Sequence, residues 1–323
     1  MSHELSIAAR LDPALRHLAG TRTDLTPGTL PAVRAGLDER RAQQAAVMDT
    51  VGVDITDVRI GSVPVRLYRG GTGVAPAVIF CHSGGFVLGN LDTDHRMCVE
   101  LARGAECSVV SVDYRLAPQE PYPAAVDDVG SVLDAVLGGA VDIDPDRVAV
   151  AGSSAGGALA AGLAQQAADR LVFQLLHQPV LDDRPSPSKE EFVDTPGFDG
   201  PAAELMWQYY LGAADCPPDA VVAGPLARGR TPLTEPADAA VPAALADLTG
   251  LPPALITCSE LDPLRDEAID YALRLMWSGV TTELHVFPGT CHGFDAFLPD
   301  WEVSLRLYAM QVAALRRAFQ LDQ

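Results

Sequence analysis

The stretch Gly152-Ser153-Ser154-Ala155-Gly156-Gly157 contains the pattern G-x-S-x-G, with Ser154 at its centre. The largely apolar residues 147–151 before it predict a buried strand, and the alanine-rich residues 158–164 after it predict a helix. A strand, a tight turn of small residues and a helix form a nucleophile elbow, which exposes a serine hydroxyl on a strained turn. The pattern therefore predicts that Ser154 attacks acyl carbonyls, and that glycine flanks it because a larger side chain would crowd the turn.

Composition limits the possible partners of the chain. Its 323 residues, 48% of them hydrophobic, are enough for one large α/β core with a small cap. There is no run of 18 apolar residues and no secretory signal at the N-terminus, so we expect a cytoplasmic protein with no membrane association. A formal charge of −20 repels nucleic acid, which leaves a small molecule as the expected partner.

The cysteine and lysine residues exclude several kinds of catalytic or metal site. The six cysteines are scattered singly without a C-x-x-C pair, which argues against a zinc knuckle or a thioredoxin-like motif. No two histidines or carboxylates stand at ligand spacing on one element, so we expect no metal, and we expect no cofactor. Cys81, Cys107 and Cys258 lie in or beside apolar runs and should be buried free thiols, and Cys291 should be structural. Lys189 is the only lysine and lies in a polar segment interrupted by prolines, which predicts a loop and argues against lysine catalysis.

The rest of the chain alternates between strand and helix signals. Six runs are apolar on both faces, as in the strands of a buried parallel sheet: 77–80, 108–112, 148–150, 173–176, 254–257 and 284–287. Helical segments lie between or after them: 124–137, 155–168, 265–278 and 301–319. This alternation predicts an α/β fold with a mostly parallel central sheet flanked by helices.

Two regions depart from this alternation and predict a helical cap. Residues 1–50 should form two helices, one beginning after Asp12-Pro13 and one covering 30–47. Residues 182–245 are dense in proline and acidic residues and read as an insertion over the carboxyl edge of the sheet. The catalytic core would then comprise 51–181, beginning with a hairpin that turns at Gly61-Ser62, and 246–323.

A nucleophilic serine needs a base, and the base needs a carboxylate. His292 lies in a glycine-flanked loop after the last predicted strand and is third in the order Ser…Asp…His. Asp262 lies between them, where a strand ends and a helix begins, and is the favoured acid. A carboxylate there could instead cap the helix, and one carboxylate would not easily fill both roles. Glu260 and Asp266 therefore remain alternatives.

An oxyanion also needs backbone N–H donors. The loop His82-Ser83-Gly84-Gly85-Phe86 directly follows a predicted strand, and paired glycines let the backbone approach a ligand closely. We expect Gly84 and Gly85 to be donors, with Ala155 as the third. His82 should fix the shape of this loop rather than transfer protons.

Six blocks of this sequence resemble the hormone-sensitive-lipase family of bacterial carboxylesterases. In order, they are residues 82–86, 113–118, 121–128, the serine elbow 152–157, residues 262–267 and residues 292–294. The resemblance implies an α/β-hydrolase fold, hydrolysis of short- to medium-chain carboxylic esters through an acyl-enzyme, a helical cap and a possible homodimer. An amidase, a deacetylase or a lactonase would use the same triad, and a non-catalytic small-molecule binder is the remaining alternative.

Three positions depart from the family pattern. Ser83 replaces the first glycine of H-G-G-G, Ser153 stands where Asp or Thr is usual, and Gln119 stands where Glu is common. None of them is a triad residue, so they bear on the substrate. The candidate substrate-pocket residues are Phe86, Ser153, Trp207, Tyr209 and Tyr210, although aromatic residues at such spacing are as often plain core.

Overall fold

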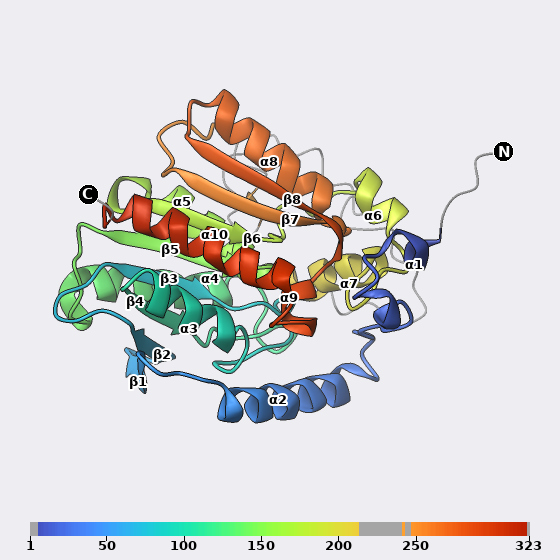
Figure 1. Ribbon diagram of the computed structural model, residues 1–323, viewed down its shortest axis with the longest axis horizontal. Coiled ribbons are helices and arrows are strands. Elements are labelled where there is room, and N and C mark those ends of the chain that lie inside the picture. The colour runs from blue at the N-terminus through green and yellow to red at the C-terminus, as the bar shows by residue number, and fades with distance from the viewer. Residues whose placement is uncertain (1–5, 213–240, 243–246, 322–323) are drawn as a thin grey trace.

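The computed structural model describes residues 6–212, 241–242 and 247–321. Within them, eight strands form one sheet in the order β1-β2-β4-β3-β5-β6-β7-β8 (Figure 1). The strands are β1 (Asp54–Ile60), β2 (Val63–Arg69), β3 (Ala77–Cys81), β4 (Ser108–Val112), β5 (Val148–Ser153), β6 (Phe173–His177), β7 (Ala254–Leu261) and β8 (Thr282–Cys291). Neighbouring strands from β4 to β8 are parallel, whereas β1 and β2 form an antiparallel hairpin beside them.

The central strands explain the uninterrupted apolar runs. Every residue of β3, β4, β5 and β6 is buried, because helices cover both faces of the sheet. All six predicted apolar runs lie within strands, and the predicted hairpin turns at Gly61, where φ is 58°. The predicted α/β-hydrolase architecture is therefore confirmed.

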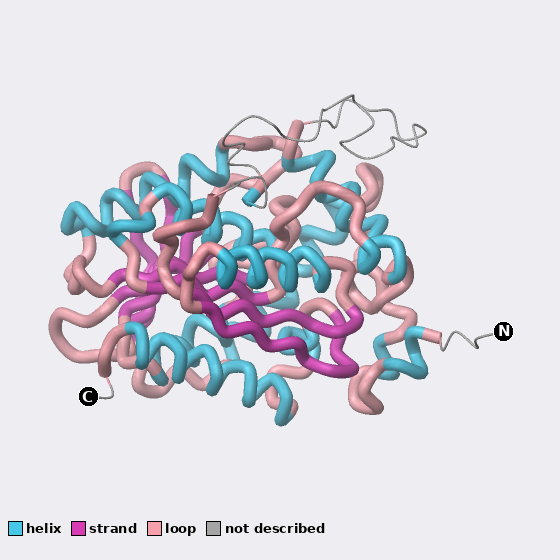
Figure 2. The backbone as a smooth tube through the Cα atoms, turned by 90° about the horizontal axis from the view of Figure 1, so that it is seen from above, coloured by secondary structure: helices cyan, strands magenta, loops and turns pink. Residues whose placement is uncertain are grey.

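Helices form a layer on each side of the strands (Figure 2). The larger helices are α2 (Leu30–Val47), α3 (His95–Gly104), α4 (Ala124–Ala135), α5 (Ala155–Gln166), α7 (Gly200–Tyr210), α8 (Arg265–Trp277) and α10 (Glu302–Ala318). The short elements are α1 (Ile7–Arg10), η1 (Arg16–Leu18), η2 (Val136–Ala140), η3 (Ala168–Arg170), α6 (Pro187–Glu191) and α9 (Phe294–Phe297). The sequence analysis did not predict α1, α3, α6, α7 or α9.

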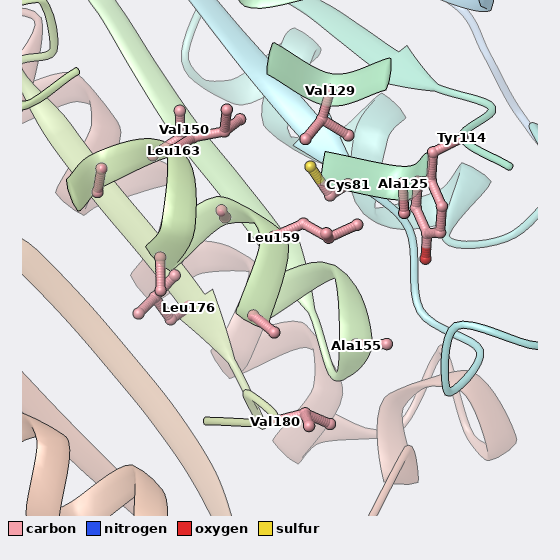
Figure 3. Packing of buried hydrophobic residues seen from close by; sticks show 14 of the residues in the cluster. Cys81, Tyr114, Ala125, Val129, Val150, Ala155, Leu159, Leu163, Leu176 and Val180 are labelled. Atoms are coloured by element: carbon pink, nitrogen blue, oxygen red, sulfur yellow. The ribbon is translucent and has the colours of Figure 1, made fainter. Parts of the chain in front are cut away.

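Two hydrophobic cores lie on the two faces of the sheet. Helices α4, α5 and α8 pack on one face, and α3 and α10 pack on the other. Figure 3 shows Leu159 and Leu163 of α5 in the first core, with Val129 of α4 and Val150 of β5. Because α5 is rich in alanine and glycine, its backbone lies close to the strands, and this fixes the helix start that follows Ser154.

Two local predictions were wrong. No α-helix begins after Asp12-Pro13, because the Asp12 carboxylate accepts a hydrogen bond from the Ala14 N–H (2.9 Å) and the Asp12 N–H donates to the carbonyl of Gly289 (2.8 Å). This tertiary contact leaves only a turn and η1. The segment around Lys189 is not a loop but the short helix α6, which is capped by the Ser186 side chain.

The N-terminal segment lies against the insertion that follows β6. The Tyr209 hydroxyl of α7 donates to the carbonyl of Leu25 (2.9 Å), and Arg10 pairs with Glu191 of α6 (2.6 Å). Figure 1 shows α1, α6 and α7 together at one end of the sheet. These contacts join the two regions expected to form a cap, while residues 213–240 and 243–246 of the insertion lie outside the described residues. No helix in the described part of the chain is long and apolar enough to cross a membrane.

Candidate active site

Ser154 lies on a sharp turn between β5 and α5. Its backbone has φ 56° and ψ −118°, an unfavourable combination for a residue with a side chain. A Cβ atom on Gly152 would lie 2.1 Å from the Gly156 carbonyl oxygen, and one on Gly156 would lie 1.9 Å from the Cys81 carbonyl oxygen. Glycine at both positions therefore allows the strained turn to form, as the sequence pattern predicts.

Ser154, His292 and Asp262 form a continuous chain of hydrogen bonds. The His292 Nε2 atom lies 3.0 Å from the Ser154 Oγ atom, and its Nδ1 atom lies 2.8 Å from the Asp262 Oδ2 atom. Asp262 is fully buried, and Ser154 is 4% exposed. With Nδ1 bound to a carboxylate, the imidazole has Nε2 available to accept the serine proton.

The Asp262 carboxylate also binds the turn that leads into α8. Its Oδ1 atom accepts a hydrogen bond from the Leu264 N–H (2.8 Å), while Oδ2 faces His292. Leu264 is the N-cap residue of α8 and makes no side-chain capping bond, so Asp262 faces His292 without also serving as the helix cap that the sequence analysis considered. The alternative acids have other contacts, because Glu260 accepts from the Gly289 N–H (2.8 Å) and Asp266 accepts from the Ser188 N–H (2.9 Å).

A buried amide that the sequence analysis missed holds the histidine loop. The Gln178 Oε1 atom accepts a hydrogen bond from the Gly293 N–H (2.6 Å), next to His292. Its Nε2 atom donates to Ser259 (3.0 Å), whose hydroxyl donates to the Cys291 carbonyl (3.0 Å). Gln178 directly follows β6, and a polar residue after a buried parallel strand is the signal that could have identified it.

The predicted oxyanion loop lies against the elbow. The N–H groups of Gly84, Gly85 and Ala155 have no hydrogen-bond acceptor among the described residues, so they are available to a ligand. Gly84 and Gly85 have φ values of 129° and 62°, which glycine adopts without strain. The positive end of α5 begins at Ala155 and favours negative charge beside Ser154.

His82 is buried beneath this loop. Its ring stacks on Tyr114 with a centroid distance of 4.1 Å, and its Nδ1 atom lies 2.8 Å from the Ser83 carbonyl oxygen. Burial lowers the His82 pKa to about 4, so the imidazole is neutral at pH 7. Because a carbonyl only accepts, Nδ1 carries the proton. This position agrees with the predicted role in loop shape.

Comparison with known proteins agrees with this geometry. Residues 78–296 match the model of a family described by the alpha/beta hydrolase fold. The chain belongs to the hormone-sensitive-lipase-like family of α/β hydrolases.

Three relatives illustrate the similarity. Carboxylesterase NlhH of Mycobacterium tuberculosis is 38% identical over 302 residues, which cover 90% of this chain and 85% of that protein. The crystal structure of esterase LipW from Mycobacterium marinum has a TM-score of 0.87 and 51% identity, and the match covers 97% of both chains. A bacterial heroin esterase has a TM-score of 0.84 and 38% identity, covering 96% of this chain and 98% of that one.

Three of the aromatic candidates for the substrate pocket, Phe86, Trp207 and Tyr210, form a packed cluster, whereas the Tyr209 hydroxyl bonds the N-terminal segment at Leu25. Phe86 stacks on Tyr210 with centroids 3.8 Å apart and lies 5.9 Å from Trp207. These three side chains and Tyr209 are each at most 4% exposed, and Ser153 is buried beside Ser154. The cluster therefore joins α7 to the end of the oxyanion loop.

Two residues of the insertion that were not predicted lie closer to the reacting groups. The Phe198 ring lies 4.9 Å from the His292 ring, and the Met206 side chain lies 3.3 Å from the position of a Cβ atom on Gly85. Neither belongs to a recognisable motif, since an apolar side chain in a proline-rich segment carries no chemical signature. Their contacts place part of the insertion over the histidine and the oxyanion loop.

Proposed function

We propose that this protein is a serine carboxylesterase that hydrolyses short- to medium-chain carboxylic esters through an acyl-enzyme. The observation that carries the proposal is the hydrogen-bonded chain from Ser154 through His292 to Asp262. Beside it lie three N–H groups with no acceptor in the described part of the chain. The relatives named carboxylesterase NlhH and esterase LipW support the same reaction class.

In the acylation half, the Ser154 Oγ atom attacks the ester carbonyl carbon while the His292 Nε2 atom accepts the serine proton. The carbonyl oxygen becomes an oxyanion and accepts hydrogen bonds from the N–H groups of Gly84, Gly85 and Ala155. The tetrahedral intermediate then collapses. The bond to the alcohol oxygen breaks, and the protonated His292 delivers its proton to the leaving alcohol.

In the deacylation half, water takes the place of the alcohol. His292 removes a proton from the water as its oxygen attacks the acyl carbon, and the same three donors bind the second oxyanion. Collapse releases the carboxylic acid and returns the proton to Ser154. Asp262 stays ionised and stabilises the imidazolium that forms in each half.

The surroundings of the site support a compact acyl group. We propose that Phe198 and Met206 bound the space above Ser154, together with the cluster of Phe86, Trp207 and Tyr210. In the same proposal, Ser153 lines this space and Tyr209 ties the cap to the N-terminal segment through Leu25. In this proposal the N-terminal helices and the insertion form the cap, with the remaining residues forming the catalytic core. Five described cysteines are free and buried, which supports a reducing, cytoplasmic location.

A fluorophosphonate probe tests the nucleophile. The probe should label the wild-type protein stoichiometrically at Ser154, as read by mass spectrometry of the labelled peptide. Ser154→Ala should lose the label and reduce kcat on the order of 10⁵-fold, whereas Ser153→Ala is the matched control and should still be labelled. A folded wild-type protein that takes up no label would exclude the proposed mechanism.

A substrate series tests the bond and the acyl length. Para-nitrophenyl esters from acetyl to palmitoyl should show the highest kcat/KM between two and eight carbons, and matched anilides should be much poorer substrates. Equal rates on esters and anilides would favour an amidase instead. A maximum at palmitoyl would contradict the compact pocket.

A further inference from the structure

We propose that Asp94 is a positioning residue that fixes the oxyanion loop by binding Ser83. This inference rests on the proposed esterase function and concerns the residue that stands where the family usually has the first glycine of its loop. It gives that departure a specific mechanical role.

Asp94 contacts Ser83 at two points. Its Oδ2 atom accepts a hydrogen bond from the Ser83 N–H at 2.6 Å, and its Oδ1 atom accepts one from the Ser83 hydroxyl at 3.2 Å. Bonds to a carboxylate are stronger than neutral ones. A glycine at position 83 would form only the first of them, so the serine hydroxyl adds a second attachment.

These contacts fix the plane of one peptide group. The Ser83 N–H and the His82 carbonyl belong to the same planar unit. Asp94 binds the N–H, and the Tyr114 hydroxyl donates to the carbonyl from the other side at 2.7 Å. With both of its polar groups held, this peptide cannot rotate without breaking a hydrogen bond.

The next peptide group carries the oxyanion donor. In a trans peptide the carbonyl of Ser83 and the N–H of Gly84 point in opposite directions. The His82 Nδ1 atom holds that carbonyl at 2.8 Å. The direction of the Gly84 N–H is therefore set by two successive peptide planes. The glycines after Ser83 carry no side chain to restrict their backbone, so the contacts of Ser83 constrain the loop before the donors, and the packing of Phe86 on Tyr210 constrains it after them.

Asp94 is itself held firmly. It is the residue before α3, with φ 56°, and its carbonyl accepts the Cys98 N–H at 3.0 Å as the first bond of that helix. A left-handed conformation at a non-glycine residue costs about 1 kcal/mol and persists only where the surroundings impose it. Asp94 and Ser83 also line a cavity of about 380 Å³ between α2 and α3. A smaller side chain at either position therefore enlarges an existing cavity and leaves the closed hydrophobic core intact.

Steady-state kinetics on para-nitrophenyl acetate test the proposal. Asp94→Ala should lower kcat by about 30-fold, less than the 10²–10³-fold loss on removing an oxyanion donor, with KM changed less than twofold. Asp94→Asn keeps an oxygen that can accept from the Ser83 N–H and adds an N–H₂ group that can donate to the Ser83 hydroxyl. Its kcat should therefore be at least tenfold higher than that of Asp94→Ala. Ser83→Gly should lower kcat several-fold. Asp94→Ala should have a smaller effect in the Ser83→Gly background, because the two residues act through one contact.

A transition-state mimic separates positioning from general loss of structure. The affinity of a trifluoromethyl ketone, whose adduct places an oxyanion in the hole, should fall in parallel with kcat across these variants. Asp92→Ala is the matched control, since Asp92 lies two residues away and pairs with Arg66 (2.6 Å) rather than with the loop. It should keep kcat within twofold.

Two outcomes would overturn the proposal. In one, the folded Asp94→Ala variant keeps the wild-type kcat, whether or not its KM changes. In the other, Asp92→Ala and Asp94→Ala lose activity equally. A wild-type protein without esterase activity would instead refute the proposed function, so the two failures can be told apart.

Discussion

At the scale of single residues, the contact between the Asp262 Oδ2 atom and the His292 Nδ1 atom sets the tautomer of His292. Asp262→Asn would place an amide N–H₂ or an amide oxygen opposite Nδ1, and neither stabilises the imidazolium as a carboxylate does. We expect kcat to fall about 10⁴-fold with little change in KM, as measured by ester hydrolysis.

Asp266→Asn is the control for that substitution. Asp266 lies four residues further on and binds the Ser188 N–H rather than the histidine, so its kcat should stay within a few-fold of wild type. Equal losses in both variants would show that the start of α8, and not the contact with His292, is what activity depends on.

At the level of residues, the sequence singles out a candidate where a residue type has few alternatives, and the structure brings those candidates into contact. Ser154 lies in a distinctive pattern, and His292 follows the last strand, so order along the chain identifies both. Gln178 was missed because its place after a buried strand signals a polar position but not its partner, and the hydrogen bond from the Gly293 N–H at 2.6 Å is visible only in the structure. Asp94 was missed because its contact with Ser83 is likewise visible only in the structure.

At the scale of elements, the close approach of α5 to the sheet makes Gly156 indispensable. A Cβ atom there would lie 1.9 Å from the backbone carbonyl oxygen of Cys81, which has no flexible side chain to move aside. Gly156→Ala should therefore lower the free energy of unfolding by more than about 3 kcal/mol, measured by urea denaturation.

Gly130→Ala tests whether the cost comes from the clash. Gly130 lies inside α4, and a Cβ atom on it would meet nothing within 4 Å. Alanine is the better helix former, so this variant should be more stable than wild type by about 0.5–1 kcal/mol. Loss of stability in both variants would contradict the packing explanation.

Strands were easier to predict than helices. The runs that became β3 to β8 are apolar on both faces, and burial between two helical layers requires that composition. Helix α3 begins from left-handed Asp94 without a side-chain cap, so it lacks the usual start signal. The expected helix after Asp12-Pro13 did not form because its first residue binds Gly289, a contact 277 positions away that local sequence cannot encode.

At the scale of the whole molecule, two buried groups should oppose each other in the pH dependence of stability. Burial lowers the pKa of His82 to about 4, so the unfolded chain binds its proton first, and stability falls as the pH drops below about 6.5. Burial raises the pKa of Glu267 to about 7, although Lys189 lies 2.6 Å away and opposes that rise. Its contribution therefore has the opposite sign, and is lost as the pH rises toward 7.

Because these contributions partly cancel, the raw stability curve conceals them, and a difference between variants is needed. His82→Asn keeps an N–H donor near the position of Nδ1 but does not titrate. Between pH 7 and pH 5, the wild-type free energy of unfolding should fall by about 2 kcal/mol relative to this variant, as measured by urea denaturation. Glu267 titrates equally in both proteins and drops out of the difference. A pH-independent difference would mean that the His82 pKa in the folded protein equals its value in the unfolded chain, as for a solvated imidazole, and would contradict the burial of a neutral ring beside the Ser83 carbonyl.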